Sequence, residues 1–305
     1  MKKPSNSAIS AGLLLAVFLW GANNTATKYL IGFWPPGLVG CARFAIAGII
    51  LLAILRWTKL LGQSGKTPPE LNRPLWWRGG LTLAAYTLVM NFALVSAPIS
   101  HVAVYLGASP VWALLWEGRP EKNWKSAQRY LAAVLALIGV FVLFLPAWSG
   151  TSHQLMGEML GLISSFLWTN YGIQCRVFAQ KISGAQVAAQ TFWRASVLLI
   201  PFVIYELAKS QPVLSWKLVG IQLFCAVGGG VIAYALWNGA LRHWKVGQVY
   251  LFNNLIPLST VLWAHLLLGE QITPTFWIAT ILIIAGVLFG QADWQKIFGR
   301  RWSPE

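Results

Sequence analysis

Acidic residues are scarce in this sequence. Of the 305 residues only eight are Asp or Glu, and charged residues of both signs make up 10% of the chain, whereas a soluble globular domain has about 25%. Hydrophobic residues make up 57%, and 18 residues are tryptophan. This composition excludes a soluble domain and is typical of a membrane protein, whose surroundings are the lipid bilayer.

Cysteine is rare as well, and the three that are present, Cys41, Cys175 and Cys225, stand apart in apolar stretches. Their spacing indicates neither a disulfide framework nor a metal site. The sequence also has no nucleotide-binding loop and no nucleophile placed with a base. We therefore expect no metal, no cofactor and no enzymatic activity.

The few acidic residues are placed in the gaps between apolar segments or near the ends of these segments. None falls in the middle of a segment, where a proton-coupling carboxylate or a counter-ion for a hydrophobic cation would be expected. The sequence therefore disfavours proton antiport through a central acid. His101 and His265 remain as groups that could titrate.

The basic residues give a net charge of +15, but they indicate no nucleic-acid partner, because they stand in short gaps between apolar segments. If the N-terminus is cytoplasmic, 18 of the 23 lysines and arginines fall in cytoplasmic gaps and three fall in outward-facing gaps. Basic residues accumulate on the cytoplasmic side of membrane proteins. We therefore expect a multi-pass protein with both termini in the cytoplasm.

Long apolar runs dominate the chain. A helix that spans the bilayer needs roughly 17 to 25 mostly apolar residues. Such segments occur at 7–30, 35–56, 78–97, 99–116, 127–146, 155–176, 186–208, 217–241, 246–268 and 273–291. The sequence therefore predicts an all-α membrane protein with ten transmembrane helices, and it leaves the exact end of the fourth helix open.

The chain repeats itself at an offset of 147 to 151 residues. The matched pairs include Trp20 with Trp168, Lys28 with Arg176, Arg43 with Arg194, Asn91 with Asn238, and Pro110 with Pro257. Two copies of five helices insert in opposite directions, and inverted repeats are typical of secondary transporters that bind substrate near the midplane. We expect repeats over 7–146 and 152–291, followed by a basic cytoplasmic tail over 292–305.

Polar and aromatic residues gather on single faces of several predicted helices. Trp20, Asn23 and Asn24 fall at positions i, i+3 and i+4, which lie on one helix face. An unpaired amide in hydrocarbon costs several kcal/mol, so these side chains need partners, water or a ligand. We predict that such faces line a substrate cavity. Its candidate residues are Trp20, Asn23, Asn24, Tyr86, Asn91, Tyr105, Trp112, Trp168, Tyr171, Asn238, Tyr250, Asn253 and Asn254.

Each candidate also has a simpler explanation. Asparagine side chains join helices to one another in lipid, so any single amide could be structural. Pro110 and Pro257 each remove a backbone hydrogen bond from a helix. We expect both to break their helices, either to offer a carbonyl group to the substrate or to produce a kink.

Four basic residues likewise allow two roles each, one in binding or gating and one in the structure. Arg43 and Arg194 lie within apolar segments, where a charge is costly unless it is paired or solvated. Each could anchor an anionic substrate, or it could bond to a helix end. Lys28 and Arg176 lie at helix ends, where they could anchor the protein at the interface or guard an entrance.

Four stretches carry a further signal: FLWGANNTATKY at 18–29, LVGCARFAIAG at 38–48, IPLSTVLWAHLLLGEQIT at 256–273 and AGVLFG at 285–290. Together they resemble the EamA family of the drug/metabolite transporter superfamily. The resemblance implies ten helices in inverted repeats, with export of small metabolites such as amino acids from a bacterial cytoplasmic (inner) membrane. It also implies a cavity lined mainly by helices one, three, four, six, eight and nine.

The first copy departs from that family's pattern, because it reads LLWEGRPEKNWK where the second copy ends a helix with Gly-Glu. We expect an exporter of small neutral or amphipathic metabolites, most of all amino acids, that works by alternating access. A lipophilic drug exporter, an organophosphate or sugar-nucleotide carrier, and a non-transporting membrane scaffold are the alternatives. The expected partner is a small-molecule substrate, and both a monomer and a homodimer remain open.

Overall fold

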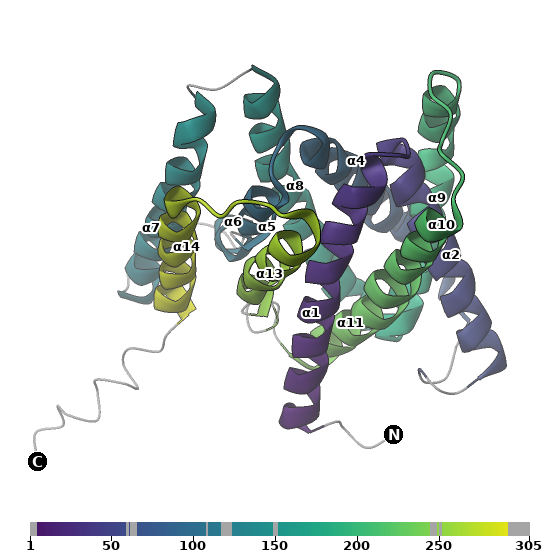
Figure 1. Cartoon of the computed structure of the whole chain (residues 1–305). Coiled ribbons are helices and arrows are strands. Elements are labelled where there is room, and N and C mark those ends of the chain that lie inside the picture. Colours follow the sequence, from purple (N-terminus) through teal and green to yellow (C-terminus); the bar gives the residue numbers. More distant parts are fainter. Residues whose placement is uncertain are drawn as a thin grey trace, which may run out of the picture.

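The chain is helical through the residues that can be described (Figure 1). The computed structural model describes residues 5–58, 61, 66–107, 109–116, 124–148, 152–244, 249 and 252–291. Within these ranges every regular element is a helix, so the predicted all-α architecture is confirmed. Five helical stretches are long and apolar enough to cross a membrane, namely Asn6–Ile31, Pro36–Trp57, Pro69–Ser96, Gly184–Leu207 and Trp216–His243.

The elements follow the predicted segments in order. The first half contains α1 (Asn6–Ile31), α2 (Pro36–Trp57), α3 (Pro69–Pro74), η1 (Leu75–Gly80), α4 (Leu81–Ser96), α5 (Ile99–Gly107), α6 (Ser109–Trp116) and α7 (Trp124–Trp148). The second half contains α8 (Ser152–Ala179), α9 (Gly184–Leu207), α10 (Trp216–Phe224), η2 (Cys225–Ile232), α11 (Ala233–His243), η3 (Phe252–Leu255), α13 (Ile256–Leu268) and α14 (Pro274–Gln291).

Local sequence signals set the ends of several helices. The hydroxyl of Ser5 caps the N-terminus of α1, and Ser183 forms a reciprocal capping box with Gln186 at the start of α9. Such caps satisfy backbone N–H groups that have no partner within the helix. At the other end of α13, Gly269 takes a positive φ of 65°, a conformation that glycine adopts without steric cost.

Three segments differ from the sequence-based boundaries. The third begins at Pro69, nine residues earlier than expected, because proline starts a helix readily and α3, η1 and α4 then run on without a gap. The fourth is two short helices, with α6 starting one residue before Pro110. In the ninth, the short η3 precedes α13, whose first turn contains Pro257.

Two π-helical segments, η1 and η2, occupy corresponding places in the two halves. Each lies inside a long helical stretch and contains consecutive glycines, Gly79 and Gly80 in η1 and 228–230 in η2. A β-carbon on Gly80 would lie 2.8 Å from Cβ of Arg194, and one on Gly229 would lie 2.4 Å from Oδ1 of Asn23. The glycines therefore let neighbouring helices approach closely, and π-helical turns often accompany functional sites.

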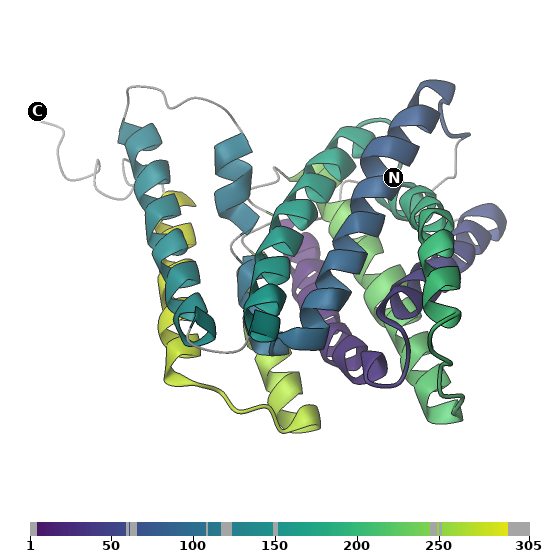
Figure 2. The ribbon, with the colours of Figure 1, turned by 90° about the horizontal axis from the view of Figure 1, so that it is seen from above.

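The helices pack in pairs that join the two halves of the chain. In both views α7 and α14 run side by side at one edge of the molecule (Figures 1 and 2). Elsewhere α2 packs against α9, α4 against α8, and α1 against both α13 and α11. The centre of the molecule is consequently where α1, α4, α8 and α11 meet, and aromatic and amide side chains gather there.

Candidate functional site

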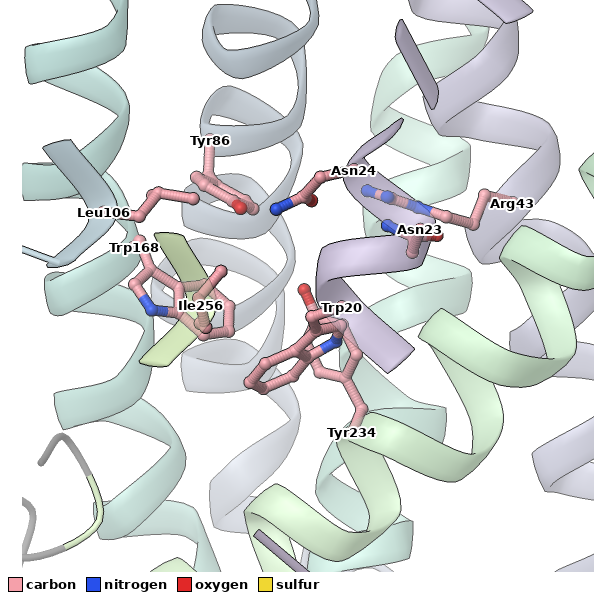
Figure 3. Close-up of a pocket in the computed structure, with 9 residues that line it drawn as sticks. All are labelled: Trp20, Asn23, Asn24, Arg43, Tyr86, Leu106, Trp168, Tyr234 and Ile256. Carbon is pink, nitrogen blue, oxygen red and sulfur yellow. The ribbon is translucent and has the colours of Figure 1, made fainter. Parts of the chain in front are cut away.

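A cavity lies at this centre, between helices of both halves (Figure 3). The empty space between its side chains is about 350 Å³, a volume that includes the opening to solvent. Its lining residues are Trp20, Asn23, Asn24, Arg43, Tyr86, Leu106, Trp168, Tyr234 and Ile256. The first half of the chain supplies six of the nine, and the second half supplies the other three.

Aromatic rings form one side of the cavity, the lower side in Figure 3. Trp20 of α1 and Trp168 of α8 are matched positions in the two halves, and their rings meet edge to face with centroids 5.3 Å apart. Tyr234 of α11 lies 5.2 Å from Trp20 and 5.8 Å from Trp168. The Trp20 indole N–H donates to the carbonyl oxygen of Gly229 in η2 at 3.0 Å, which fixes the ring.

Polar groups occupy the opposite side of the cavity, the upper side in Figure 3. Asn24 donates to the Thr260 hydroxyl in a long bond of 3.5 Å. The Asn23 side-chain oxygen is buried and has no hydrogen-bond partner among the described residues. An unsatisfied buried acceptor costs about 1–3 kcal/mol, so this amide oxygen is free to accept from water or a ligand.

Arg43 brings a positive charge to the polar side. The residue is only 5% exposed, its Nε has no hydrogen-bond partner in the described part of the chain, and its guanidinium lies 4.5 Å from the centroid of the Phe44 ring. No acidic residue is among the nine that line the cavity. The cavity therefore presents an uncompensated cation beside amides and aromatic rings, an arrangement that favours an anionic group.

Arg194, the position matched to Arg43, is held by neighbours and does not line the cavity. Its guanidinium donates to the backbone and side-chain oxygens of Gln190 at 2.9 and 2.5 Å, and to the side-chain oxygen of Asn72 at 2.7 Å. It also lies 4.3 Å from the Trp193 ring centroid. These contacts give Arg194 a structural role, the simpler of the two explanations that its sequence allows.

Lys28 and Arg176 play matching parts in the two halves. The Lys28 ammonium group donates to the backbone oxygens of Leu94 and Ala97, at the C-terminal end of α4. Arg176 donates to the backbone oxygen of Trp244, at the C-terminal end of α11. A cation at a helix C-terminus satisfies free carbonyl groups and interacts favourably with the helix dipole. Neither residue lines the cavity.

Several predicted binding residues are engaged outside the cavity. Asn91 donates to the backbone oxygen of Pro36 at 2.8 Å, Trp112 donates to the Ser165 hydroxyl at 2.6 Å, and the Tyr171 hydroxyl bonds with that of Thr191 at 2.9 Å. These are contacts between helices, so all three residues have a structural explanation.

Five further candidates fall outside the lining for different reasons. Asn238 is fully buried, and its amide atoms have no partner among the described residues, but its backbone packs beside Gly184 and the residue is not among those that line the cavity. Tyr105 contacts Glu158. Tyr250 lies outside the described residues, and for Asn253 and Asn254 the description covers only the backbone of η3.

Glu158 lies near the end of a helix, as expected, but it is buried. This residue lies in the second turn of α8 and has no exposed surface. The sequence-based segment began at 155, close to Glu158, because the polar residues before it obscure the start of a helix that begins at Ser152. The His101 ring and the Tyr105 hydroxyl both bond to its carboxylate.

Three lining residues were not among the predicted site residues. Tyr234 lies on the same helical stretch as Asn238, and the polar face of that stretch is one that the sequence predicts to line the cavity. Leu106 and Ile256 are apolar residues in apolar segments. Nothing in the sequence distinguishes them from core positions, because only the packing of helices brings them to the cavity.

Comparison with known proteins bears on this arrangement. The model of the EamA-like transporter family matches residues 8–145 and 155–290. A "Probable amino-acid metabolite efflux pump" of Escherichia coli (strain K12) is 22% identical over 299 residues, which cover 95% of this chain and 94% of that protein. An "Uncharacterized transporter" of Archaeoglobus fulgidus is 26% identical over 298 residues, covering 92% of this chain and 96% of the relative.

A solved crystal structure supports the same architecture. It superposes with a TM-score of 0.68 and covers 98% of this chain and 100% of the other, at 21% sequence identity. A likeness at this identity speaks for the fold alone. The cavity and its chemistry must therefore be interpreted from the residues of this chain.

Proposed function

This chain belongs to the EamA-like transporter family, and we propose that it is a secondary transporter that exports small metabolites with a carboxylate group and an apolar or aromatic body. Amino acids are the first class to consider. The protein is a multi-pass membrane protein, and in our proposal it lies in a bacterial inner membrane with both termini in the cytoplasm. The similar efflux pump of Escherichia coli is named for amino-acid metabolites, which supports this class.

Arg43 carries the proposal. The guanidinium group is buried, lines the cavity, and has no acidic neighbour among the lining residues. A carboxylate would bind this group by charge-assisted hydrogen bonds, which are shorter and stronger than bonds between neutral groups. The amides of Asn23 and Asn24 would bind the ammonium and carboxylate groups of an amino acid, while Trp20 and Trp168 would contact its side chain.

Alternating access is the mechanism we propose. Trp20 comes from α1 and Trp168 from α8, so the aromatic side of the cavity lies where the two halves of the chain meet. If the two halves are inverted repeats, they could rock about this contact and open the cavity to either side in turn. A ligand that lacked the matching polar groups would leave buried amides unpaired, which disfavours its binding.

Counterflow in proteoliposomes tests the proposal. Vesicles preloaded with unlabelled phenylalanine, leucine or glutamine receive the same amino acid in labelled form, and transport appears as transient accumulation of label. We expect exchange of the apolar and aromatic amino acids, and its loss in Asn24→Ala and Trp20→Ala. Trp216→Ala, at a residue that is 91% exposed, serves as the tryptophan control. Absence of any exchange by folded wild-type protein would refute the amino-acid proposal.

An organophosphate carrier is the second candidate, because it requires a basic residue at the cavity and Arg43 lines it. Counterflow with phosphoenolpyruvate and glucose 6-phosphate distinguishes this candidate, since a phosphate monoester carries a larger charge than a carboxylate. A lipophilic cation is disfavoured, because the cavity offers a guanidinium and no acidic group among its lining residues.

A further inference from the structure

A buried acid–base cluster lies apart from the cavity lining, between α5 and α8. We call it the His–Glu–Tyr cluster; its members are His101, Tyr105 and Glu158. Nδ1 of His101 lies 2.7 Å from Oε1 of Glu158, and the Tyr105 hydroxyl donates to Oε2 of Glu158 at 2.6 Å. His101 and Tyr105 are four residues apart on α5 and so share one helix face, which is turned toward α8.

The cluster is almost completely buried. Glu158 has no exposed side-chain surface, whereas the His101 side chain is 9% exposed. Tyr105 is fully buried, and its ring packs so closely on α8 that a β-carbon at Gly161 would lie 2.6 Å from it. Removing a carboxylate from water costs free energy. A contact with a purely structural role would therefore be more stable if apolar residues made it. The imidazole is the more exposed of the two paired groups, so in our proposal a proton reaches the carboxylate through it.

The other charged groups around the cluster have partners of their own. Glu270 accepts from the backbone N–H groups of Ile99 and Ser100 at 2.9 and 3.1 Å, at the start of α5. Lys28 of α1 binds the carbonyl end of α4 and interacts electrostatically with Glu270.

Two other histidines lie near these acidic residues, one before Glu158 in sequence and one in contact with Glu270. His153 precedes Glu158 on α8 and is exposed, and His265 of α13 bonds with the backbone oxygen of Glu270. In the described part of the chain, His101 is thus the titratable base in contact with the Glu158 carboxylate.

The helix α5 connects the cluster to the cavity. Leu106, the residue after Tyr105, lines the cavity, so α5 contacts the cavity and the cluster within one turn. The α5 helix belongs to the first half of the chain and α8 to the second. A change in the bonding between His101 and Glu158 would alter a contact across the two halves that alternating access must separate or reorient.

From this geometry we infer that the His–Glu–Tyr cluster is the proton-binding site of a proton-coupled exporter, an inference that rests on the proposed function. With a neutral imidazole that donates through Nδ1–H and an ionised carboxylate, the pair carries a net charge of −1. Binding one proton, at Nε2 or by transfer to the carboxylate, brings the pair to zero. Release of that proton restores the first state. The cycle exchanges one inward proton for one outward cargo molecule and breaks no other bond.

A pH gradient across proteoliposomes tests the inference, with labelled phenylalanine as the probe. One pH unit corresponds to about 1.4 kcal/mol per proton, so coupling to one proton gives up to about tenfold accumulation on the acidic side. We expect wild-type protein to approach this ratio. Glu158→Gln and His101→Gln should give equal concentrations on both sides, while they retain phenylalanine counterflow, which requires no net proton movement.

His153→Gln is the matched control, because it removes an exposed histidine five residues before Glu158 on the same helix. This variant should keep the wild-type accumulation ratio. Counterflow in each variant also demonstrates that the protein is folded; if Glu158→Gln fails that check, His101→Gln provides the test.

The outcomes separate the two proposals. Active counterflow by wild-type protein without gradient-driven accumulation overturns the coupling and leaves the proposed function intact. Accumulation that persists in both Glu158→Gln and His101→Gln also overturns the coupling, since the proton would then bind elsewhere. If wild-type protein exchanges none of the amino acids or phosphorylated compounds, the proposed function fails and the coupling fails with it.

Discussion

Arg43 and Arg194 occupy matched positions in the two halves of the chain, on helices that pack against each other, and yet their surroundings differ. Arg194 is bound by Gln190 and Asn72 and packs on Trp193. Arg43 lines the cavity and contacts the Phe44 ring, and its Nε, like that of Arg194, has no hydrogen-bond partner among the described residues. One arginine is thus held by neighbouring side chains, and the other faces the cavity.

The difference has a local cause in the sequence. Gln190 lies four residues before Arg194, where a helix brings the two side chains together, whereas the residue four before Arg43 is Val39. Valine offers no side-chain acceptor, so the contact that holds Arg194 has no counterpart at Arg43. The two matched positions therefore differ in their surroundings because a neighbour on the helix differs.

Arg43→Gln is the sharpest test of this comparison and has the largest expected effect. Hydrogen bonds to charged groups contribute about 1.5–3 kcal/mol, so losing the guanidinium should lower kcat/KM for a carboxylate-bearing cargo roughly 100-fold. The melting temperature in detergent should change little, because the contact of the Arg43 guanidinium with the Phe44 ring is weaker than the hydrogen bonds that hold Arg194. A variant that transports normally would remove the distinction between the two arginines.

Arg194→Gln should show the opposite pattern. Loss of its bonds to Gln190 and Asn72 should lower the free energy of unfolding by about 2 kcal/mol, measured by thermal denaturation of the purified protein. Transport by the fraction that remains folded should keep the wild-type KM, because Arg194 does not line the cavity. A raised KM without loss of stability would show that both arginines contact the cargo, and the comparison would fail.

Much of this fold could be predicted from the sequence because the signals that specify it are local. Apolar runs and caps place the helices, and the repeat by itself pairs Trp20 with Trp168. The helix-face pattern also selects Asn23, Asn24 and Tyr86, which line the cavity. The features that could not be predicted depend on packing between distant segments. Asn91 shares its helix with Tyr86 but reaches Pro36 in α2.

Glu158 illustrates the same limit for charge. A carboxylate close to a predicted helix end is ordinarily solvated, and the sequence places no base beside it. Its partners lie 53 and 57 residues away on α5, so their contact with Glu158 emerges only when α5 packs against α8. The buried cluster could therefore be recognised only in three dimensions, although the sequence marks His101 as a group that could titrate.

Gly229→Ala should displace the Asn23 side chain that lines the cavity. Its effect on transport should be smaller than that of Arg43→Gln. A β-carbon at this position would lie 2.4 Å from Oδ1 and 2.5 Å from Cγ of Asn23. Overpacking typically costs about 1–3 kcal/mol, and relief by movement of Asn23 should raise KM for the cargo about tenfold. Gly220→Ala is the control in α10, where nothing lies within 4 Å of the added carbon. Unchanged transport in Gly229→Ala would argue that the Asn23 amide does not bind cargo.

Lys28→Gln and Arg176→Gln provide the complementary test, since this matched pair kept the same role in both halves. Each cation binds carbonyl groups at a helix C-terminus, and such interactions contribute about 0.3–1 kcal/mol. We therefore expect two small and similar losses of stability, each about 1 kcal/mol or less, with KM unchanged. Thermal denaturation and counterflow of both variants, measured side by side, check this expectation. Unequal losses, or a change in KM for only one variant, would mean that this pair has diverged as well, and asymmetry alone would no longer distinguish Arg43 as the residue that meets the cargo.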